Sequence, residues 1–361
     1  MAKAVLALSK IISLKNQLPI LANILFDAQE NNFTLSGTNL ETSLVITVPA
    51  KIEKTGKLAL PAKTFQEIIS SLPPQNLEME EQGNSVTIKC AKTTMEIRTI
   101  NADDFPQISK APQNKSDWSL KASDLALACQ QVGFSASTDD SRPNLTAMRL
   151  ETGKNGMSFV TTDGYRLSKK EIKGDFDQLP VLLIPAKAVI EVARLSAGKG
   201  EIKLSRDVNK NQLIFVFENF QLSTRLIEAQ FPPYTKVIPS AWQIEAEVDK
   251  DEFLQALKTA AIFARESSNI VKISVGDNLL VVTANSDSTG DDKTEIEAKV
   301  KGGEVKVAFN VRFVIDFLNS TTSTAVLMKF GDSLSPVIFQ DAQDMTLTHV
   351  IMPVRLAAQT D

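Results

Sequence analysis

The chain has 361 residues, of which 43% are hydrophobic and 23% are charged, and its formal net charge is −4. This composition is typical of a folded globular protein, and the length predicts more than one domain. The negative charge argues against a protein that binds nucleic acid over its whole surface, because such proteins usually carry a marked basic excess.

Several classes of protein are disfavoured by local sequence. No run of about 18 apolar residues predicts a membrane span, and residues 1–12 do not resemble a secretion signal, so we expect a cytoplasmic protein. Cys90 and Cys129 lack the spacing of a metal or redox motif. We expect them to be buried, reduced thiols.

Helical patterns occur at three places, each early in a similar segment of the chain: residues 5–12, 125–132 and 253–261. Ser123-Asp124 and Asp249 precede the second and third patterns and are typical N-cap residues. Short alternating runs, such as residues 203–207, 212–217 and 220–226, predict antiparallel strands. Each segment is therefore expected to contain helix, strands, a second helix and further strands.

A strand-to-helix junction recurs at equal intervals of about one third of the chain. Pro61 in LALPAK, Pro185 in LLIPAK and Phe309 in VKVAFNV occupy the same place in the three copies. An amphipathic run follows each junction, at residues 64–72, 188–195 and 312–318. A second motif, at residues 33–39, 157–163 and 279–285, recurs at nearly the same interval. The two motifs together indicate a threefold internal repeat.

The repeat predicts an α+β protein of three similar domains, each with two helices packed on antiparallel sheets. Polar connectors at residues 111–116 and 238–243 place the domains at residues 1–116, 117–241 and 242–361. If the sheets continue from one domain to the next, the chain ends in unpaired sheet edges. A second copy would satisfy these edges head to tail and close a ring of six domains.

The sequence lacks the motifs of common enzyme classes. His349 is its one histidine, and it contains no GxSxG, GxxxxGK[ST] or GxGxxG motif. We therefore expect no catalytic residues, no metal site and no cofactor. Two alternatives stay open beside a ring: a structural assembly protein of repeated domains, and a β-rich hydrolase.

These features together resemble the bacterial DNA polymerase III β subunit, the β sliding clamp. The resemblance covers the whole chain and rests on the repeat, on TDGYRL at residues 162–167, on FNV at residues 309–311 and on MPVRL at residues 352–356. It implies a non-catalytic homodimeric ring that encircles duplex DNA without sequence specificity and gives a polymerase processivity. The implied partners are the replicative polymerase, a clamp loader, repair and translesion polymerases, and other proteins with a clamp-binding motif.

The resemblance also implies three sets of site residues. The partner-peptide groove comprises Leu145, Thr162, Gly164, Tyr165, Arg166, Leu167, Pro232, Lys236, Val237, Asn310, Phe313, Leu334, Pro336, Val350, Met352, Pro353, Val354, Arg355 and Leu356. The DNA channel comprises Lys15, Lys63, Arg142, Lys187, Arg194, Lys199 and Arg312, and the dimer interface Phe105, Ile262 and Phe263. In the groove, Arg166 and Arg355 are expected to hold polar groups of the peptide.

Overall fold

The computed structural model describes residues 1–12, 18–109, 111, 118–154, 156–174, 176, 180–286, 288 and 290–355. The chain folds into two compact units, which are treated separately below. Unit 1 consists of Met1–Ser123 and Glu191–Leu226, and unit 2 of Asp124–Ile190 and Ile227–Asp361. The middle repeat therefore contributes to both units.

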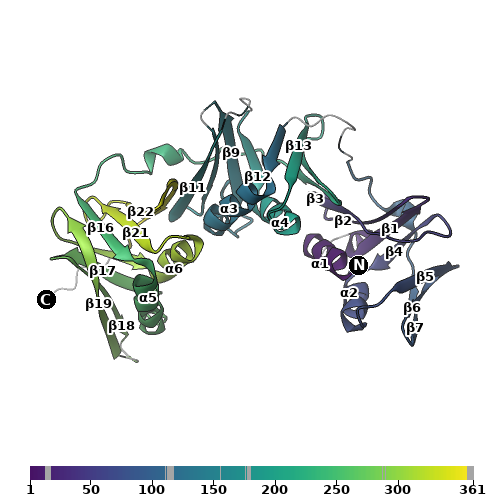
Figure 1. Ribbon diagram of the computed structural model, residues 1–361, viewed down its shortest axis with the longest axis horizontal. Coiled ribbons are helices and arrows are strands. Elements are labelled where there is room, and N and C mark those ends of the chain that lie inside the picture. The colour runs from purple at the N-terminus through teal and green to yellow at the C-terminus, as the bar shows by residue number, and fades with distance from the viewer. Residues whose placement is uncertain are drawn as a thin grey trace. The chain divides into compact units, whose positions relative to one another are not determined.

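Two α-helices occur in each repeat of the described chain: α1 (Ala2–Ile11) and α2 (Ala62–Ser71), α3 (Ala122–Val132) and α4 (Ala186–Ser196), α5 (Lys250–Ala264) and α6 (Val311–Ser320) (Figure 1). The predicted cap of α5 is confirmed, because the Asp249 carboxylate accepts the N–H groups of Asp251 and Glu252. The predicted cap of α3 is wrong. That helix begins at Ala122, so Ser123 and Asp124 lie within its first turn.

Unit 1 contains an eight-stranded antiparallel sheet of order β4-β1-β2-β3-β15-β14-β13-β8 and a three-stranded sheet of order β5-β6-β7. The strands are β1 (Asn23–Gln29), β2 (Asn32–Thr38), β3 (Thr42–Thr47), β4 (Gly56–Pro61), β5 (Leu77–Gln82), β6 (Ser85–Cys90), β7 (Thr93–Arg98), β8 (Trp118–Lys121), β13 (Glu201–Asp207), β14 (Gln212–Phe217) and β15 (Phe220–Arg225).

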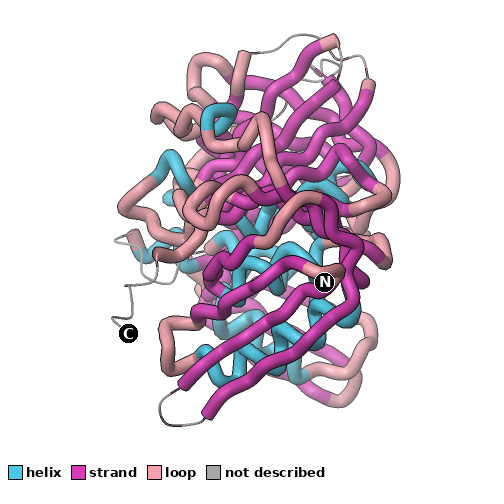
Figure 2. Tube along the Cα trace, turned by 90° about the vertical axis from the view of Figure 1, so that its left-hand side faces the viewer, coloured by secondary structure: helices cyan, strands magenta, loops and turns pink. Residues whose placement is uncertain are grey.

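Unit 2 contains a twelve-stranded sheet of order β12-β9-β10-β11-β23-β22-β21-β16-β19-β18-β17-β20. Its strands are β9 (Ala147–Gly153), β10 (Gly156–Thr162), β11 (Arg166–Lys173), β12 (Leu182–Pro185), β16 (Ile244–Asp249), β17 (Ile270–Gly276), β18 (Leu279–Ser286), β19 (Gly290–Lys301), β20 (Val305–Asn310), β21 (Ala325–Phe330), β22 (Val337–Asp341) and β23 (Asp344–Ile351). Figure 2 shows the strands of these sheets side by side.

The sheets cross the boundaries between repeats, which was the condition for a ring. In unit 1, β15 of the second repeat pairs antiparallel with β3 of the first, from Phe220↔Ile46 to Thr224↔Thr42. In unit 2, β23 of the third repeat pairs in the same way with β11 of the second, from Arg166↔Ile351 to Lys170↔Leu347. At both junctions, the last strand of one repeat thus lies beside the third strand after the first helix of the preceding repeat.

Helix α6 shows how the local sequence produces the core of the third repeat. Val311, Val314, Phe317 and Leu318 are buried on one face of this helix, at the spacing expected of an amphipathic helix. Phe317 and Phe309 both contact the ring of Phe339 from the sheet. Each fully buried side chain of this size contributes about 1.5–3 kcal/mol. None of the described helices is long and apolar enough to cross a bilayer.

Candidate partner-binding groove

Three predicted groove residues of unit 2, Leu167, Val350 and Val237, belong to or pack against a small apolar core formed by the second and third repeats. This core consists of Ala147, Val160, Leu167, Leu183, Phe231, Tyr234, Ile338 and Val350, with Ile227, Val237 and Ile238 packed against it. Leu167 and Val350 face each other in the register of β11 and β23. The residues predicted to form the floor of the groove therefore include core residues held by the continuous sheet.

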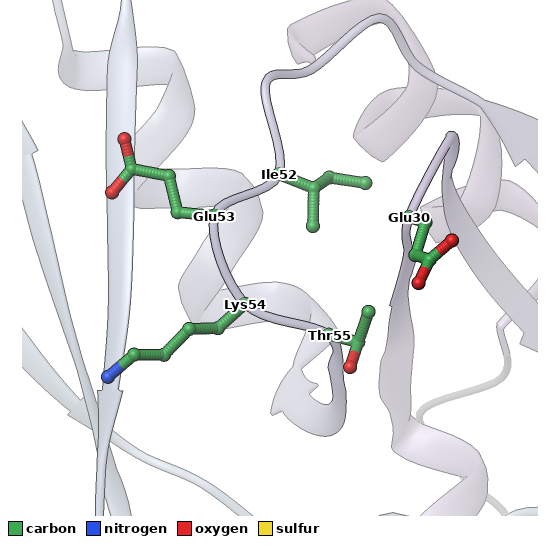
Figure 3. Close-up of a pocket in the computed structure, with 5 residues that line it drawn as sticks. All are labelled: Glu30, Ile52, Glu53, Lys54 and Thr55. Atoms are coloured by element: carbon green, nitrogen blue, oxygen red, sulfur yellow. The ribbon is translucent and has the colours of Figure 1, made fainter.

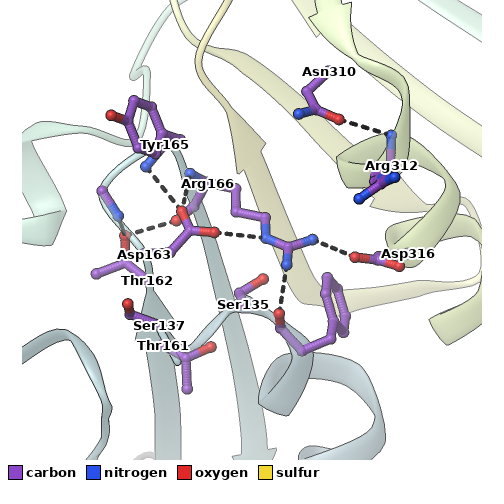
Figure 4. Close-up of polar contacts among 12 residues, drawn as sticks. Ser135, Ser137, Thr161, Thr162, Asp163, Tyr165, Arg166, Asn310, Arg312 and Asp316 are labelled. Atoms are coloured by element: carbon purple, nitrogen blue, oxygen red, sulfur yellow. Dashed lines mark hydrogen bonds and ion pairs between the residues drawn. The ribbon is translucent and has the colours of Figure 1, made fainter. Parts of the chain in front are cut away.

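The turn between β10 and β11 is shaped by Asp163 (Figure 4). Its Oδ1 accepts the N–H groups of Tyr165 at 2.9 Å and Arg166 at 3.0 Å, which is an Asx-type turn. Gly164 has a φ of +94°, a conformation that favours glycine. The turn leaves Tyr165 61% exposed, so its ring is available to a ligand.

Arg166 points into the protein from this turn. Its Nε donates to Asp163, one Nη donates to Asp316 on α6, and the other donates to the carbonyl oxygen of Phe134 (Figure 4). The side chain is 11% exposed. The prediction that Arg166 holds peptide groups did not foresee that three of its five N–H groups already have acceptors in the protein.

The β10–β11 turn is one wall of the predicted groove, and the segment after β23 is a second. The N–H of Met352 donates to the carbonyl of Tyr165 at 2.9 Å, and that of Val354 to the carbonyl of Ala308 at 2.8 Å. Met352, Pro353 and Val354 are half-buried and Arg355 is exposed. These bonds place apolar side chains beside the β10–β11 turn. The predicted groove residue Leu356 lies outside the described residues.

A third wall, residues 232–237, is held by residues that sequence reasoning missed. The Arg149 guanidinium lies 5.7 Å from the ring centroid of Phe231 and 5.6 Å from that of Tyr234, within the range of cation–π contacts. Arg149 also pairs with Glu151, which accepts the Tyr234 hydroxyl at 3.3 Å. Burial and the nearby Glu151 carboxylate raise the pKa of Tyr234 to about 12.

The described groove residues differ in exposure. Leu145, Thr162, Leu167 and Val350 are buried; Arg166, Pro232, Val237, Asn310, Phe313, Pro336, Met352, Pro353 and Val354 are half-buried; Gly164, Tyr165, Lys236, Leu334 and Arg355 are exposed. The buried set includes Leu167 and Val350 of the apolar core, and the half-buried set includes the segment from Met352 to Val354. An apolar floor with a few polar groups at its rim suits a short peptide.

The predicted DNA-contacting residues are exposed wherever the structure describes them, and Lys15 lies outside the described residues. Lys63, Lys187 and Arg312 are each the second residue of the second helix in their repeat. Lys199 lies in the turn after α4. Arg142 pairs with Asp139 at 3.2 Å and Lys187 with Asp140 at 3.6 Å.

Arg194 is held by an acidic neighbour. It pairs with Glu191 one turn earlier on α4, and this hydrogen bond raises the pKa of the guanidinium. Lys10 of α1 lies 3.9 Å from the same carboxylate. The negative charge of Glu191 therefore offsets part of the positive charge of Arg194 and Lys10.

The three predicted interface residues lie in different surroundings. Ile262 on α5 is 55% exposed, whereas Phe105 is 9% exposed within the single chain. Phe263 is half-buried against the core of the third repeat. Ile262 thus has the most surface to offer a partner.

A separate hollow in unit 1 is lined by Glu30, Ile52, Glu53, Lys54 and Thr55 and contains none of the predicted site residues (Figure 3).

Comparison with known proteins agrees with this architecture. Family models of the DNA polymerase III beta subunit match in order: the N-terminal domain at residues 1–109, the central domain at 119–233 and the C-terminal domain at 235–355. Three such domains with sheets continuing between them define a DNA sliding clamp. The chain belongs to the DNA polymerase III beta subunit family.

Individual relatives are similar over nearly the whole chain. The beta sliding clamp of Staphylococcus aureus (strain Mu50) is 29% identical over 360 residues, covering 96% of this chain and 94% of the relative. The DNA polymerase III beta subunit of Thermotoga maritima has a TM-score of 0.91 at 27% identity, covering 99% of this chain and 97% of that structure. The sliding clamp of Bacillus subtilis, at 24% identity, a TM-score of 0.90 and the same coverage, supports the fold alone. These similarities favour a sliding clamp over the structural-assembly and hydrolase alternatives.

Proposed function

We propose that two copies of this chain form a head-to-tail ring that encircles duplex DNA and holds client proteins through the groove of unit 2. The observation that carries the proposal is the repeated strand pairing at the two junctions, β3 with β15 and β11 with β23. Each junction joins the third strand after the first helix of one repeat to the last strand of the next. The same rule, applied between two chains, joins the third repeat of one to the first repeat of the other.

The strands that this pairing requires have open edges in the described chain. The last strand of the first repeat, β7, ends the order β5-β6-β7. In the third repeat, the third strand after the first helix is β19, which pairs with β16 through residues 298–301 and with β18 through residues 290–297. Its first part therefore has a neighbour on one side. Pairing of β7 with this part of β19 in a second copy would satisfy both edges.

Contact with DNA is proposed for the exposed cations, foremost Lys63, Lys187 and Arg312. One basic residue recurs at the same helical position in each repeat, so a dimer would present six in equivalent places. Few, exposed contacts to phosphates carry no sequence information and are screened by salt. Enclosure of the duplex, rather than tight binding, would then keep the protein on DNA.

We propose domains of residues 1–116, 117–241 and 242–361, since β8 and β16 begin just after the two boundaries.

The proposed clients are the replicative polymerase, repair and translesion polymerases and other proteins that carry a clamp-binding peptide. A clamp loader would open the ring, because a closed ring cannot thread onto circular DNA. We propose that the chain acts in the cytoplasm without catalytic activity of its own.

The experiment that tests this function measures retention on DNA. The protein is loaded onto nicked circular DNA by its loader and ATP, and bound protein is counted before and after the circle is cut. We expect protein to be lost only after linearisation. Retention on linear DNA at high salt would contradict enclosure and indicate direct binding.

A further inference from the structure

The guanidinium of Arg166 is surrounded by acceptors from three segments of unit 2. Nε donates to Asp163 Oδ2 at 3.0 Å, Nη1 to Asp316 Oδ2 at 2.6 Å and Nη2 to the Phe134 carbonyl at 2.7 Å. Three of the five guanidinium N–H groups are thus used within the protein, so Arg166 could offer a peptide carboxylate its full set of donors only by breaking these bonds. Its arrangement suits a structural connection better than a ligand contact.

These bonds connect the β10–β11 turn, which carries predicted groove residues, to helix α6, which carries another. Asp163 belongs to the β10–β11 turn of the second repeat, and Asp316 lies in the middle of α6 in the third repeat (Figure 4). The Arg166 guanidinium also lies 4.5 Å from the ring centroid of Phe313, a predicted groove residue on α6. The position of Phe313 relative to Tyr165 therefore depends on this arginine.

We propose that Asp316 is a positioning residue of the groove, which acts through Arg166 to fix the β10–β11 turn against α6. The proposal rests on the proposed function of the groove as a peptide site. Asp316 does not contact the client; it sets the spacing between Tyr165 and Phe313, which do. Binding sites generally need such supporting contacts, because small errors in the position of contact residues weaken binding.

The exposure of Asp316 makes this role testable without unfolding the protein. Its side chain is 42% exposed, so solvent screens the ion pair and its loss should change global stability little. A matched control is Glu247, whose side chain is 37% exposed and pairs with Lys299 at 2.7 Å in the same repeat. Glu247→Ala removes a similar ion pair away from Arg166.

The first measurement uses the free protein and no peptide. We compare backbone hydrogen exchange in wild type, Asp316→Ala, Asp316→Glu and Glu247→Ala. We expect faster exchange in the β10–β11 turn and in the first half of α6 for Asp316→Ala alone, with Asp316→Glu close to wild type. Unchanged exchange in both segments for Asp316→Ala would overturn the proposal.

The second measurement is the affinity for a fluorescein-labelled peptide of about ten residues that carries two leucines, one phenylalanine and one aspartate, chosen for an apolar groove with a basic rim. We expect Asp316→Ala to weaken binding about tenfold, the effect of losing one charged hydrogen bond. Asp316→Glu should restore most of the affinity, and Glu247→Ala should match wild type.

A double variant separates positioning from direct contact. If Arg166 acts through Asp316, adding Arg166→Lys to Asp316→Ala costs little further affinity, since coupled residues are not additive. A further loss as large as that of Arg166→Lys alone would make Arg166 a ligand of the peptide and overturn the proposal. Failure of the wild type to bind the peptide would contradict the proposed function, and the exchange data would then decide the role of Asp316.

Discussion

Nδ1 of His349 and Oγ of Ser168 share a hydrogen bond of 2.7 Å at a register pair of β23 and β11, beneath the groove. The hydroxyl of Ser168 is in turn bonded to that of Ser135 at 2.6 Å. The imidazole stacks on Phe317 with 5.1 Å between ring centroids and 7° between ring planes. Burial, followed by the positive charge of Arg166, lowers the pKa of His349 to about 3.

This histidine should make folding sensitive to mild acid. Its ordinary pKa is 6.5, so between that value and about 3 the unfolded chain binds a proton that the folded chain does not. Stability is therefore lost as pH falls below 6.5, at about 1.4 kcal/mol per pH unit. We expect urea unfolding to show this additional slope in wild type but not in His349→Gln, between pH 6.5 and about 5. Equal slopes would mean that His349 accepts a proton in the folded protein.

The walls of the groove can be tested at Val354, which is half-buried and held by its backbone bond to Ala308. A carboxylate at this position would be desolvated by an apolar peptide. We expect Val354→Asp to weaken peptide binding at least about tenfold, in line with a loss above 1.4 kcal/mol, and to leave thermal unfolding nearly unchanged. Met345→Asp, at a site 55% exposed on β23, is the control. Equal affinities of the two variants would place the peptide elsewhere.

The recurring cations predict a change in the salt dependence of DNA binding. We expect replacement of Lys63, Lys187 and Arg312 by glutamine to reduce the slope of log K against log salt by about 0.9 for each phosphate that is no longer neutralised. Fluorescence anisotropy with duplex DNA at several salt concentrations measures this slope. The control replaces Lys54, Lys92 and Lys154, which are exposed outside the helices. The same slope in both triple variants would show that Lys63, Lys187 and Arg312 do not contact DNA.

Dimer formation should depend on Ile262. This residue is 55% exposed on α5, and burial of a charge there would oppose association. We expect Ile262→Asp to sediment as a monomer at concentrations where wild type is a dimer. Val208→Asp, at a position that is 70% exposed, should leave the dimer intact. A dimeric Ile262→Asp would show that the interface lies elsewhere.

Local signals in the sequence located the helices and several of the strands. Periodicity and the Asp249 cap identified α5, and the alternation of residues 212–217 identified β14, because caps and side-chain periods depend on neighbours in sequence. The second helices begin earlier than their apolar runs indicate, at Ala62, Ala186 and Val311. These first residues adopt helical geometry directly after the strand, which periodicity alone does not reveal.

Contacts between residues that are far apart in the sequence could not be predicted from the sequence. The bond between Arg166 and Asp316 joins positions 150 residues apart, and neither residue type nor local spacing indicates that they meet. The contacts of Arg149 with Phe231 and Tyr234 likewise join residues that are far apart in the sequence and meet only in the folded protein. The division of the middle repeat between two compact units also follows from strand pairing, since β15 lies beside β3 and β23 beside β11.

Strand β5 has, among the described residues, a neighbour on one side only. Its exposed residues include Glu78, Glu80 and Glu81. Exposed strand edges promote aggregation, and like charges facing each other across two strands are unfavourable. The acidic edge of β5 should therefore keep molecules from stacking through the wrong side of this sheet. Repulsion among these three glutamates would then prevent fibrous aggregation of the protein at high concentration.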